Sequence, residues 1–159
     1  MPSLGVDWES IRGQFGIISK MIRERLKKFN NFKQEVKFGN NTRFDFLLYK
    51  GKQKAFLEVK NVTLTRENKV AEFPDAITSR GSKHLLQLIK SLKKGYNAYV
   101  LFLTQIQGIN NFRIAKDIDS TYYKEYLDAK KSGVSFLAYR CSLNSKEIKI
   151  EKKIKVLNE

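Results

Sequence analysis

The chain is poor in cysteine, histidine and proline, with one, one and two of these among 159 residues. A single cysteine cannot form an internal disulfide or a four-thiolate zinc site, and a single histidine excludes any site that needs two imidazoles. With only 9 glycines as well, the composition does not fit a disordered or fibrous chain. The cysteine content and the lack of a signal-peptide pattern predict a protein of the reducing cytoplasm.

Long apolar runs and acidic residues are also scarce. No stretch of about 18 apolar residues occurs, so no transmembrane segment is predicted. Only 16 Asp and Glu accompany 31 Lys and Arg, which gives a formal net charge of +15 and a pI near 9.9. Such a surface attracts polyanions, and nucleic acid held through its phosphates is the first expectation. An anionic membrane bound by a basic N-terminal helix is the weaker alternative.

The apolar residues that are present suffice for one core. They make up 42% of the chain, and the length predicts a single domain over residues 1–159. Apolar residues three or four apart over residues 11–29 predict an amphipathic helix, which Asp7 or Ser10 would cap. Helical spacing returns over residues 79–94 and 120–132.

The remaining pattern predicts strands. These cover residues 33–38, 43–49, 55–61, 98–104, 134–139 and 146–156. Short loops between the first three predict an antiparallel meander, and the apolar run from Ala98 to Thr104 predicts a central strand. The stretch from Val62 to Thr78 has no clear period and is predicted to be a long loop. The order α-β-β-β-α-β-α-β-β predicts an α/β fold with a mixed central sheet flanked by helices.

One constellation carries chemistry: Asp45 and the tripeptide Glu58-Val59-Lys60. Strand periodicity puts Glu58 and Lys60 on one face, and a hairpin brings Asp45 within a few ångströms of Glu58. Two converging carboxylates suit Mg²⁺ or Mn²⁺, and a neighbouring lysine can position a water and offset phosphate charge. The alternative is an ordinary ion bridge on a solvated sheet face. The apolar neighbours of both acids favour the metal site, because burying a carboxylate without a ligand is costly.

Asp45, a spacer and then Glu58-x-Lys60 after a helix resemble the PD-(D/E)XK nuclease signature. Longer motifs surround this signature: RFDFLL from Arg43, EVKNVTL from Glu58, FPDAITSRGSKHL from Phe73, and Ile118-Asp119. Together these motifs resemble the sugar fermentation stimulation protein A (SfsA) family. The similarity spans about residues 31–159, whereas residues 1–30 do not resemble the small OB-like barrel that precedes the nuclease-like domain in this family.

The resemblance implies a restriction-endonuclease-like domain that binds DNA. It implies a metal held at Asp45, Glu58 and Val59, a catalytic Lys60, and Glu35 as an accessory acid. The expected activity is that of a Mg²⁺-dependent nuclease or phosphodiesterase with little sequence specificity. The alternative is a regulatory protein that keeps the fold and binds DNA without cutting it. The N-terminal helix offers a further candidate acid, which is Glu24 or Glu9.

Other residues are candidates for contacts with nucleic acid. Arg80, Lys83 and His84 open a predicted helix, whose free N–H groups favour a phosphate. Arg43 and Asn61 flank the predicted acids. Ordinary helix capping explains the helix start equally well, and a lone histidine beside an apolar stripe is commonly a packing residue.

Two further predictions concern a loop residue and the oligomeric state. Asp75 follows Pro74 and is either a turn residue or an accessory to the metal site. The lysine-rich C-terminal strand and the N-terminal helix both offer surfaces for a homodimer.

Overall fold

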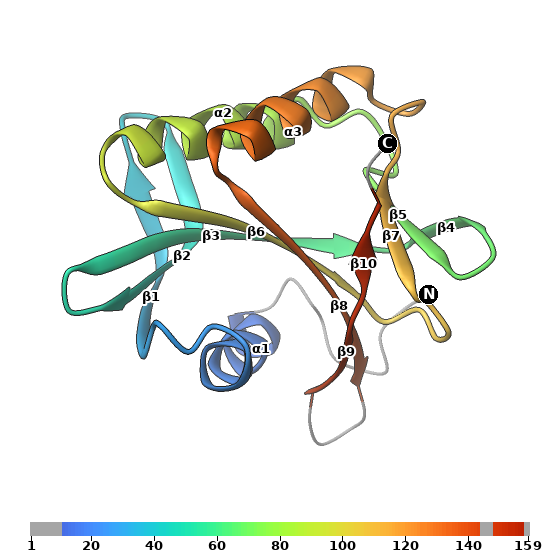
Figure 1. Cartoon of the computed structure of the whole chain (residues 1–159), viewed down its shortest axis with the longest axis horizontal. Coiled ribbons are helices and arrows are strands. Elements are labelled where there is room, and N and C mark those ends of the chain that lie inside the picture. The colour runs from blue at the N-terminus through green and yellow to red at the C-terminus, as the bar shows by residue number, and fades with distance from the viewer. Residues whose placement is uncertain (1–10, 144–147, 158–159) are drawn as a thin grey trace.

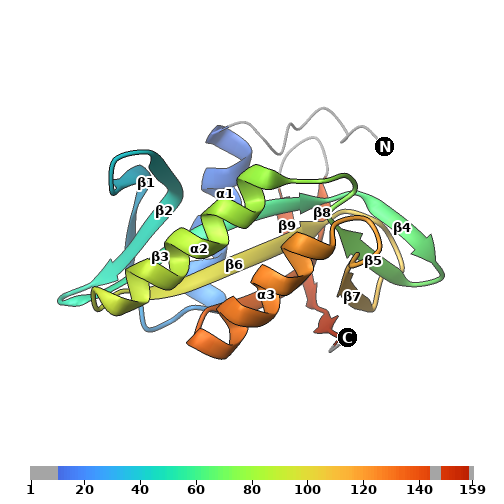
Figure 2. The same cartoon turned by 90° about the horizontal axis from the view of Figure 1, so that it is seen from above.

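The computed structural model describes residues 11–143 and 148–157 (Figures 1 and 2). The helices of this part of the chain are α1 (Ile11–Glu24), α2 (Ser79–Lys93) and α3 (Ser120–Ser132). The strands are β1 (Asn31–Phe38), β2 (Thr42–Lys50), β3 (Gln53–Val62), β4 (Leu64–Glu67), β5 (Val70–Phe73), β6 (Asn97–Thr104), β7 (Asn111–Ile114), β8 (Ser135–Leu143), β9 (Ile148–Lys153) and β10 (Lys155–Val156). Asp7, Glu9 and Ser10, named above as caps or a candidate acid, lie outside the described residues.

The main sheet is mixed and has the order β1-β2-β3-β6-β8-β9. The first three strands form the predicted antiparallel meander, β3, β6 and β8 run parallel, and β9 returns antiparallel to β8. Helix α1 covers one face, whereas α2 and α3 lie side by side on the other (Figure 1). The prediction of a mixed sheet with helices on both faces is therefore confirmed.

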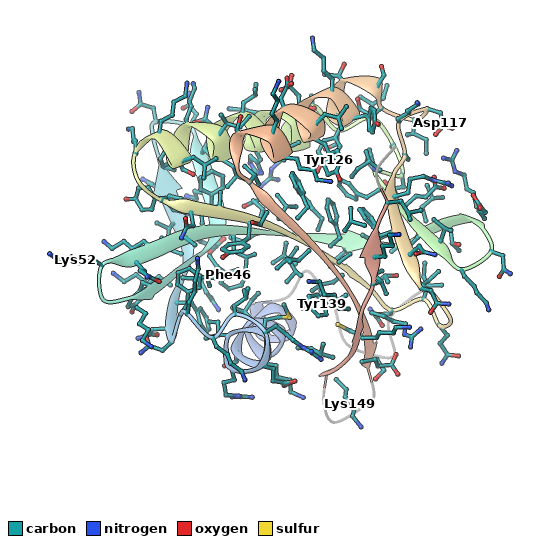
Figure 3. The ribbon with its side chains drawn as sticks, viewed as in Figure 1. Phe46, Lys52, Asp117, Tyr126, Tyr139 and Lys149 are labelled. Carbon is teal, nitrogen blue, oxygen red and sulfur yellow. The ribbon has the colours of Figure 1, made fainter. Side chains whose placement is uncertain are left out.

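Strand β6 shows why the sheet is covered on both sides. Leu101 and Leu103 are buried in the core beneath α1, whereas Val100 and Phe102 are buried in the core beneath α2 and α3. Alternate side chains of a strand point to opposite faces, so a continuous apolar run satisfies both cores. Figure 3 shows Tyr139 on the α1 side of the sheet and Tyr126 under the helices of the other face.

The predicted loop over residues 62–78 was wrong, because it contains β4 and β5. These strands join β7 and β10 in a second sheet with the order β10-β7-β5-β4. Over residues 11–143 and 148–157 the observed order is α-β-β-β-β-β-α-β-β-α-β-β-β, four strands more than predicted. All four are two to four residues long, and β5 pairs with β7, some forty positions later in the chain. Strands this short carry too few residues to show a period.

Helix α1 ends at Glu24, five residues before the predicted end at Phe29. Its apolar residues Ile18, Met21 and Ile22 are buried against the sheet. This packing uses the face that membrane binding would need. In the described part of the chain, no helix is both long and apolar enough to cross a bilayer.

Asp119 fixes where α2 and α3 begin. Its side chain accepts hydrogen bonds from the backbone N–H of Tyr122 at 3.0 Å and of Thr78 at 2.8 Å. Asp119 therefore caps α3, and it also holds the residue that caps α2. Thr78 in turn accepts from the N–H of Gly81. The first turn of α2, which carries the candidate phosphate contacts, is thereby held in a defined place.

Candidate functional site

The site forms where β2 and β3 part. Their backbone pairing runs from Lys50↔Gln53 and stops at Phe46↔Leu57, one position before Asp45 and Glu58. The two side chains replace the missing ladder: the N–H of Asp45 donates to Glu58 Oε1, and the N–H of Val59 donates to Asp45 Oδ2, each at 2.8 Å. Each carboxylate is thus bound by the backbone of the other strand, and the expected proximity of the two acids is present.

An irregularity in β1 and β2 opens this gap. Phe44 packs beneath α2 and α3, whereas Phe46 packs beneath α1. In a regular strand these two residues would share a face, so β2 twists at Asp45 between them. Across from Asp45 on β1, Glu35 has a left-handed backbone with φ 49°. A side-chain-bearing residue in that conformation marks a local strain, of the kind that gathers at functional sites.

The environment of Asp45 disfavours its charge. Burial, and next the negative charge of Glu58, raise the pKa of the Asp45 carboxyl from 3.8 to about 6. The N–H of Val59 and the charges of Lys60 and His84 oppose this shift without cancelling it. Two acids are therefore held together with less positive compensation than they need, which a cation would supply.

Glu58 is held from several directions. It is 3% exposed, and its Oε2 lies 2.9 Å from His84 Nδ1 and 3.8 Å from Lys60 Nζ. An ionised carboxylate only accepts hydrogen bonds, so Nδ1 is the donor when Glu58 is charged. His84 is therefore more than a packing residue: it fixes the buried acid and also lines the cleft described below.

The oxygen atoms of Asp45, Glu58 and Val59 can supply some of the ligands that a hard cation needs. Asp45 Oδ1 accepts no hydrogen bond from any described residue, and carboxylate oxygens are the ligands that Mg²⁺ and Ca²⁺ prefer. Val59 can contribute only its main-chain carbonyl, since its side chain has no ligand atom. Among the described residues no group of three or more His, Cys, Asp or Glu side chains is arranged around one point. A metal here would rest on two carboxylates, a carbonyl and waters.

Three predicted acids make no hydrogen bond or ion pair with Asp45 or Glu58 that the structure records. Glu35 is exposed on β1, next to the Asp45 position. Glu24 is exposed in the last turn of α1, on the opposite face of the sheet from Glu58. Asp75 is exposed in the segment before α2. The structure brings together Asp45, Glu58, Val59 and Lys60, and it adds His84 to them.

Four of the five predicted phosphate contacts line one cleft. Arg43, Arg80, Lys83 and His84 surround a space of about 480 Å³ between α2 and the β1–β2 turn. A second recess of about 290 Å³ shares Lys83 and the turn residues, and it continues along α2 to Lys94. We call the two recesses together the α2 groove. Asn61, the fifth predicted contact, follows Lys60 on β3 and does not line the groove.

The α2 groove is basic throughout. Neither recess is lined by an Asp or Glu among the described residues. Its basic lining consists of Lys37, Arg43, Arg80, Lys83, Lys90 and Lys94, all of them exposed. The groove therefore joins a positively charged surface to the buried acids through His84.

A second charged cluster, which sequence reasoning missed, lies on the small sheet. Arg66 donates in a bidentate manner to both Glu72 and Asp117, and Arg113 donates to Glu72 and Glu67. We call these five residues the small-sheet network. The guanidinium of Arg66 lowers the pKa of the buried Glu72 and holds the pKa of Asp117 at about 2. The short strands that assemble it gave no signal in the sequence.

Buried hydroxyls beside the site also escaped the sequence analysis. Tyr122 is fully buried, and its OH has no hydrogen-bond partner among the described residues, as is true of Ser82 Oγ. Burial, and next the charge of Glu58, raise the pKa of Tyr122. Tyr122 lies on the buried face of α3, and no pattern in the sequence indicated that its side chain is close to Glu58.

These features define an α/β protein with a mixed central sheet and two acids at its opened strand pair. Residues 14–147 match the family model described as "Sugar fermentation stimulation protein RE domain". The chain belongs to the SfsA family. The match begins inside α1.

Curated relatives and a solved structure support this assignment. The sugar fermentation stimulation protein homolog of Pelagibacter ubique is 61% identical over 143 residues, which cover 90% of this chain and 61% of that protein. The homolog of Clostridium perfringens strain SM101 is 42% identical, over 89% of this chain and 60% of that protein. The structure of Pyrococcus furiosus SfsA in complex with Ca²⁺ aligns with a TM-score of 0.81 at 27% identity, covering 92% of this chain and 65% of that one. The chain thus spans about three fifths of the length of these relatives.

Proposed function

We propose that this domain is a metal-dependent phosphodiesterase of the PD-(D/E)XK type that acts on nucleic acid, DNA first among its substrates. The observation that carries the proposal is the reciprocal binding of Asp45 and Glu58 to each other's backbone, with Lys60 beside them. Two carboxylates and one lysine at an opened strand pair are the groups that metal-assisted hydrolysis of a phosphodiester requires.

Asp45 and Glu58, with the carbonyl of Val59, would hold Mg²⁺ or Mn²⁺. Bound there, such an ion supplies a water of lowered pKa and stabilises charge that develops on the phosphate. The Ca²⁺ complex of the Pyrococcus furiosus relative supports a hard divalent cation in this family. The raised pKa of Asp45 supports it from within this chain, because a cation would relieve the repulsion between the two acids.

The other side chains of the site would position the attacking water and the buried acid, and they would offset negative charge on the phosphate. Lys60 is only partly exposed, and its ammonium lies near Glu58, where it can orient an attacking water and offset charge on the scissile phosphate. His84 holds Glu58 in its buried position. Glu35, exposed across from Asp45, is proposed as the accessory acid, whereas the proposal does not use Glu24 or Asp75.

The substrate would be held through phosphates rather than base edges. Arg43, Arg80 and Lys83 provide exposed positive charge beside the acids. Backbone contacts of this kind carry no sequence information, so little sequence specificity is expected.

Cleavage assays with matched variants test the proposal. Single- and double-stranded DNA and RNA oligonucleotides are incubated with the protein in Mg²⁺, in Mn²⁺ or in EDTA. We expect cleavage that requires the metal and falls at least about 100-fold in Glu58→Gln and in Lys60→Ala. Glu67→Gln, which removes an acid of the small-sheet network, should cleave like the unmodified protein. Binding without cleavage under every condition would instead support a domain that holds DNA and does not cut it.

A further inference from the structure

We infer that the α2 groove takes a single strand of nucleic acid, which runs along α2 and reaches the acids at the His84 end. The substrate class is then single-stranded DNA or RNA, or the single-stranded end of a duplex. This inference deepens the proposed function and rests on it for the chemistry, although not for the binding.

The first support is a stripe along α2. Arg80, Lys83, Gln87, Lys90 and Lys94 line the groove, and they follow one another at spacings of three and four residues. Residues spaced in this way lie on one face of a helix. At 1.5 Å per residue the stripe is about 21 Å long. Four of its five members are cations, so the helix presents a line of positive charge and not a single spot.

The second support is the facing wall. The β1–β2 turn stands beside α2 (Figure 2), and Asn40, Asn41 and Thr42 line both recesses together with Lys83. Lys37 and Arg43 add positive charge from the two strands that flank the turn. The groove therefore has basic groups on two sides and amide side chains between them. Such a lining can grip a backbone and still reach the bases that it carries.

The dimensions favour one strand over two. The recesses, of about 480 and 290 Å³, are no larger than small-molecule sites, so neither can hold the full width of a duplex. A duplex could instead admit α2 into its major groove, which accommodates a free helix. In that mode the β1–β2 hairpin and α3, which flank α2 (Figure 2), would lie against the duplex.

The charges of the groove have no acidic partner within the part of the chain that the structure describes. None of its six cations forms an ion pair with any other described residue, and Lys94 instead lies 5.3 Å from the ring centre of Phe38. Like charges in a row repel one another, and a polyanion that lies along them relieves this repulsion. From the length of the stripe we expect a footprint of roughly four to six nucleotides.

The order of the residues along the groove indicates where the bound nucleic acid lies relative to Asp45 and Glu58. His84 lines the larger recess and contacts Glu58, so we call this recess the inner one. Lys90 and Lys94 line the smaller recess, which we call the outer one. The groove thus holds nucleotides on one side of the scissile phosphate. Substitutions at its outer end should change the affinity for oligonucleotides and the minimum length that binds. They should leave the positions of Asp45 and Glu58 unchanged.

Binding in EDTA tests this inference separately from catalysis. The probes are labelled single-stranded oligonucleotides of 4, 8 and 12 nucleotides and a blunt 12-base-pair duplex, followed by fluorescence anisotropy. The variant Lys90→Glu/Lys94→Glu reverses the outer charges. The control Lys124→Glu/Lys131→Glu makes the same charge change on exposed positions of α3. The four positions are exposed, and the thermal midpoint of each variant checks folding.

We expect the groove variant to weaken binding of the 8-mer at least about tenfold, with the control within about threefold of the unmodified protein. Duplex binding should be weaker than single-strand binding from the outset. Equal losses in the two double variants, or a duplex bound as tightly as the single strand, would overturn the inference. So would a lack of binding to all oligonucleotides. Absence of cleavage with binding intact would count against the proposed function alone.

Discussion

The α2 groove and the small-sheet network use the same residue types in opposite ways. In the network, Arg66 and Arg113 are each bound to two carboxylates, and the central Glu72 is 2% exposed. In the groove, six exposed cations stand without an acid among the described residues that line it. In the network the charges are balanced by one another, whereas the cations of the groove are available to a ligand.

This difference distinguishes cations that are paired within the fold from cations that are available to a ligand. A net charge of +15 says only that cations are in excess. Charges that are already paired inside the fold are unavailable to a polyanion, and removing one partner destabilises the protein, whereas unpaired charges in a two-walled groove are available. The comparison predicts that substitutions in the network change stability, and that substitutions in the groove change binding.

The largest effect on stability should come from Glu72→Ala. The substitution removes the buried carboxylate that Arg66 and Arg113 share, and it leaves each guanidinium with one exposed acid, which is Asp117 for Arg66 and Glu67 for Arg113. We expect a loss of about 4 kcal/mol in the free energy of unfolding, measured by urea denaturation. Lys83→Ala in the groove should stay within about 0.5 kcal/mol. A Glu72→Ala protein of unchanged stability would show that the network is not what holds the small sheet.

Asp45→Asn should raise stability in metal-free buffer. The Asp45 pKa is about 6 in the folded protein against 3.8 for the free side chain, so the folded state holds more protons between these pH values. The free energy of unfolding therefore falls as pH rises through this window, and it stays lower above it. Asparagine removes this loss, and the gain at neutral pH should reach about 3 kcal/mol at most.

Urea denaturation in EDTA from pH 4 to pH 8 measures this effect. Asp117→Asn is the matched control from the network, because the pKa of Asp117 is lowered to about 2 and it does not titrate in the same window. In the control, the free energy of unfolding should still fall between pH 4 and pH 6. In Asp45→Asn this dependence on pH should become flatter. A slope unchanged in Asp45→Asn would mean that Asp45 is not held against its charge.

Patterns with many residues made most of the fold predictable. β6 could be located because an apolar run over Ala98–Thr104 needs cover on both faces, and α2 because its apolar residues recur over four turns. The closeness of Asp45 and Glu58 followed from the short hairpin between their strands, since a short turn fixes which residues face each other.

What the sequence did not reveal depends on partners far along the chain. β4 is mostly exposed, and it exists because β5 and β7 extend its sheet. The bond between His84 and Glu58 joins a helix to a strand 26 positions earlier, which no local period encodes. Likewise, the twist at Asp45 lies across from the left-handed backbone of Glu35 on the neighbouring strand, in a stretch that reads as regular alternation.

A smaller effect concerns the salt dependence of binding. Lys83→Ala removes one cation shared by both recesses. The slope of log affinity for a single-stranded 8-mer against log salt should become shallower by about 0.7. Arg66→Gln in the network should leave the slope unchanged, provided that circular dichroism shows it folded at the assay temperature. Equal changes in both variants would erase the distinction between paired and unpaired cations.

The smallest expected effect is that of Glu67→Gln. The Glu67 side chain is 61% exposed and lies 3.0 Å from Arg113, which also keeps its contact with Glu72. Solvent screens such a pair, so the free energy of unfolding should change by less than about 0.5 kcal/mol. Urea denaturation at low and high salt measures this, and oligonucleotide affinity should stay the same. A tighter complex would show that Glu67 repels the ligand, and would extend the binding surface from the α2 groove to the small sheet.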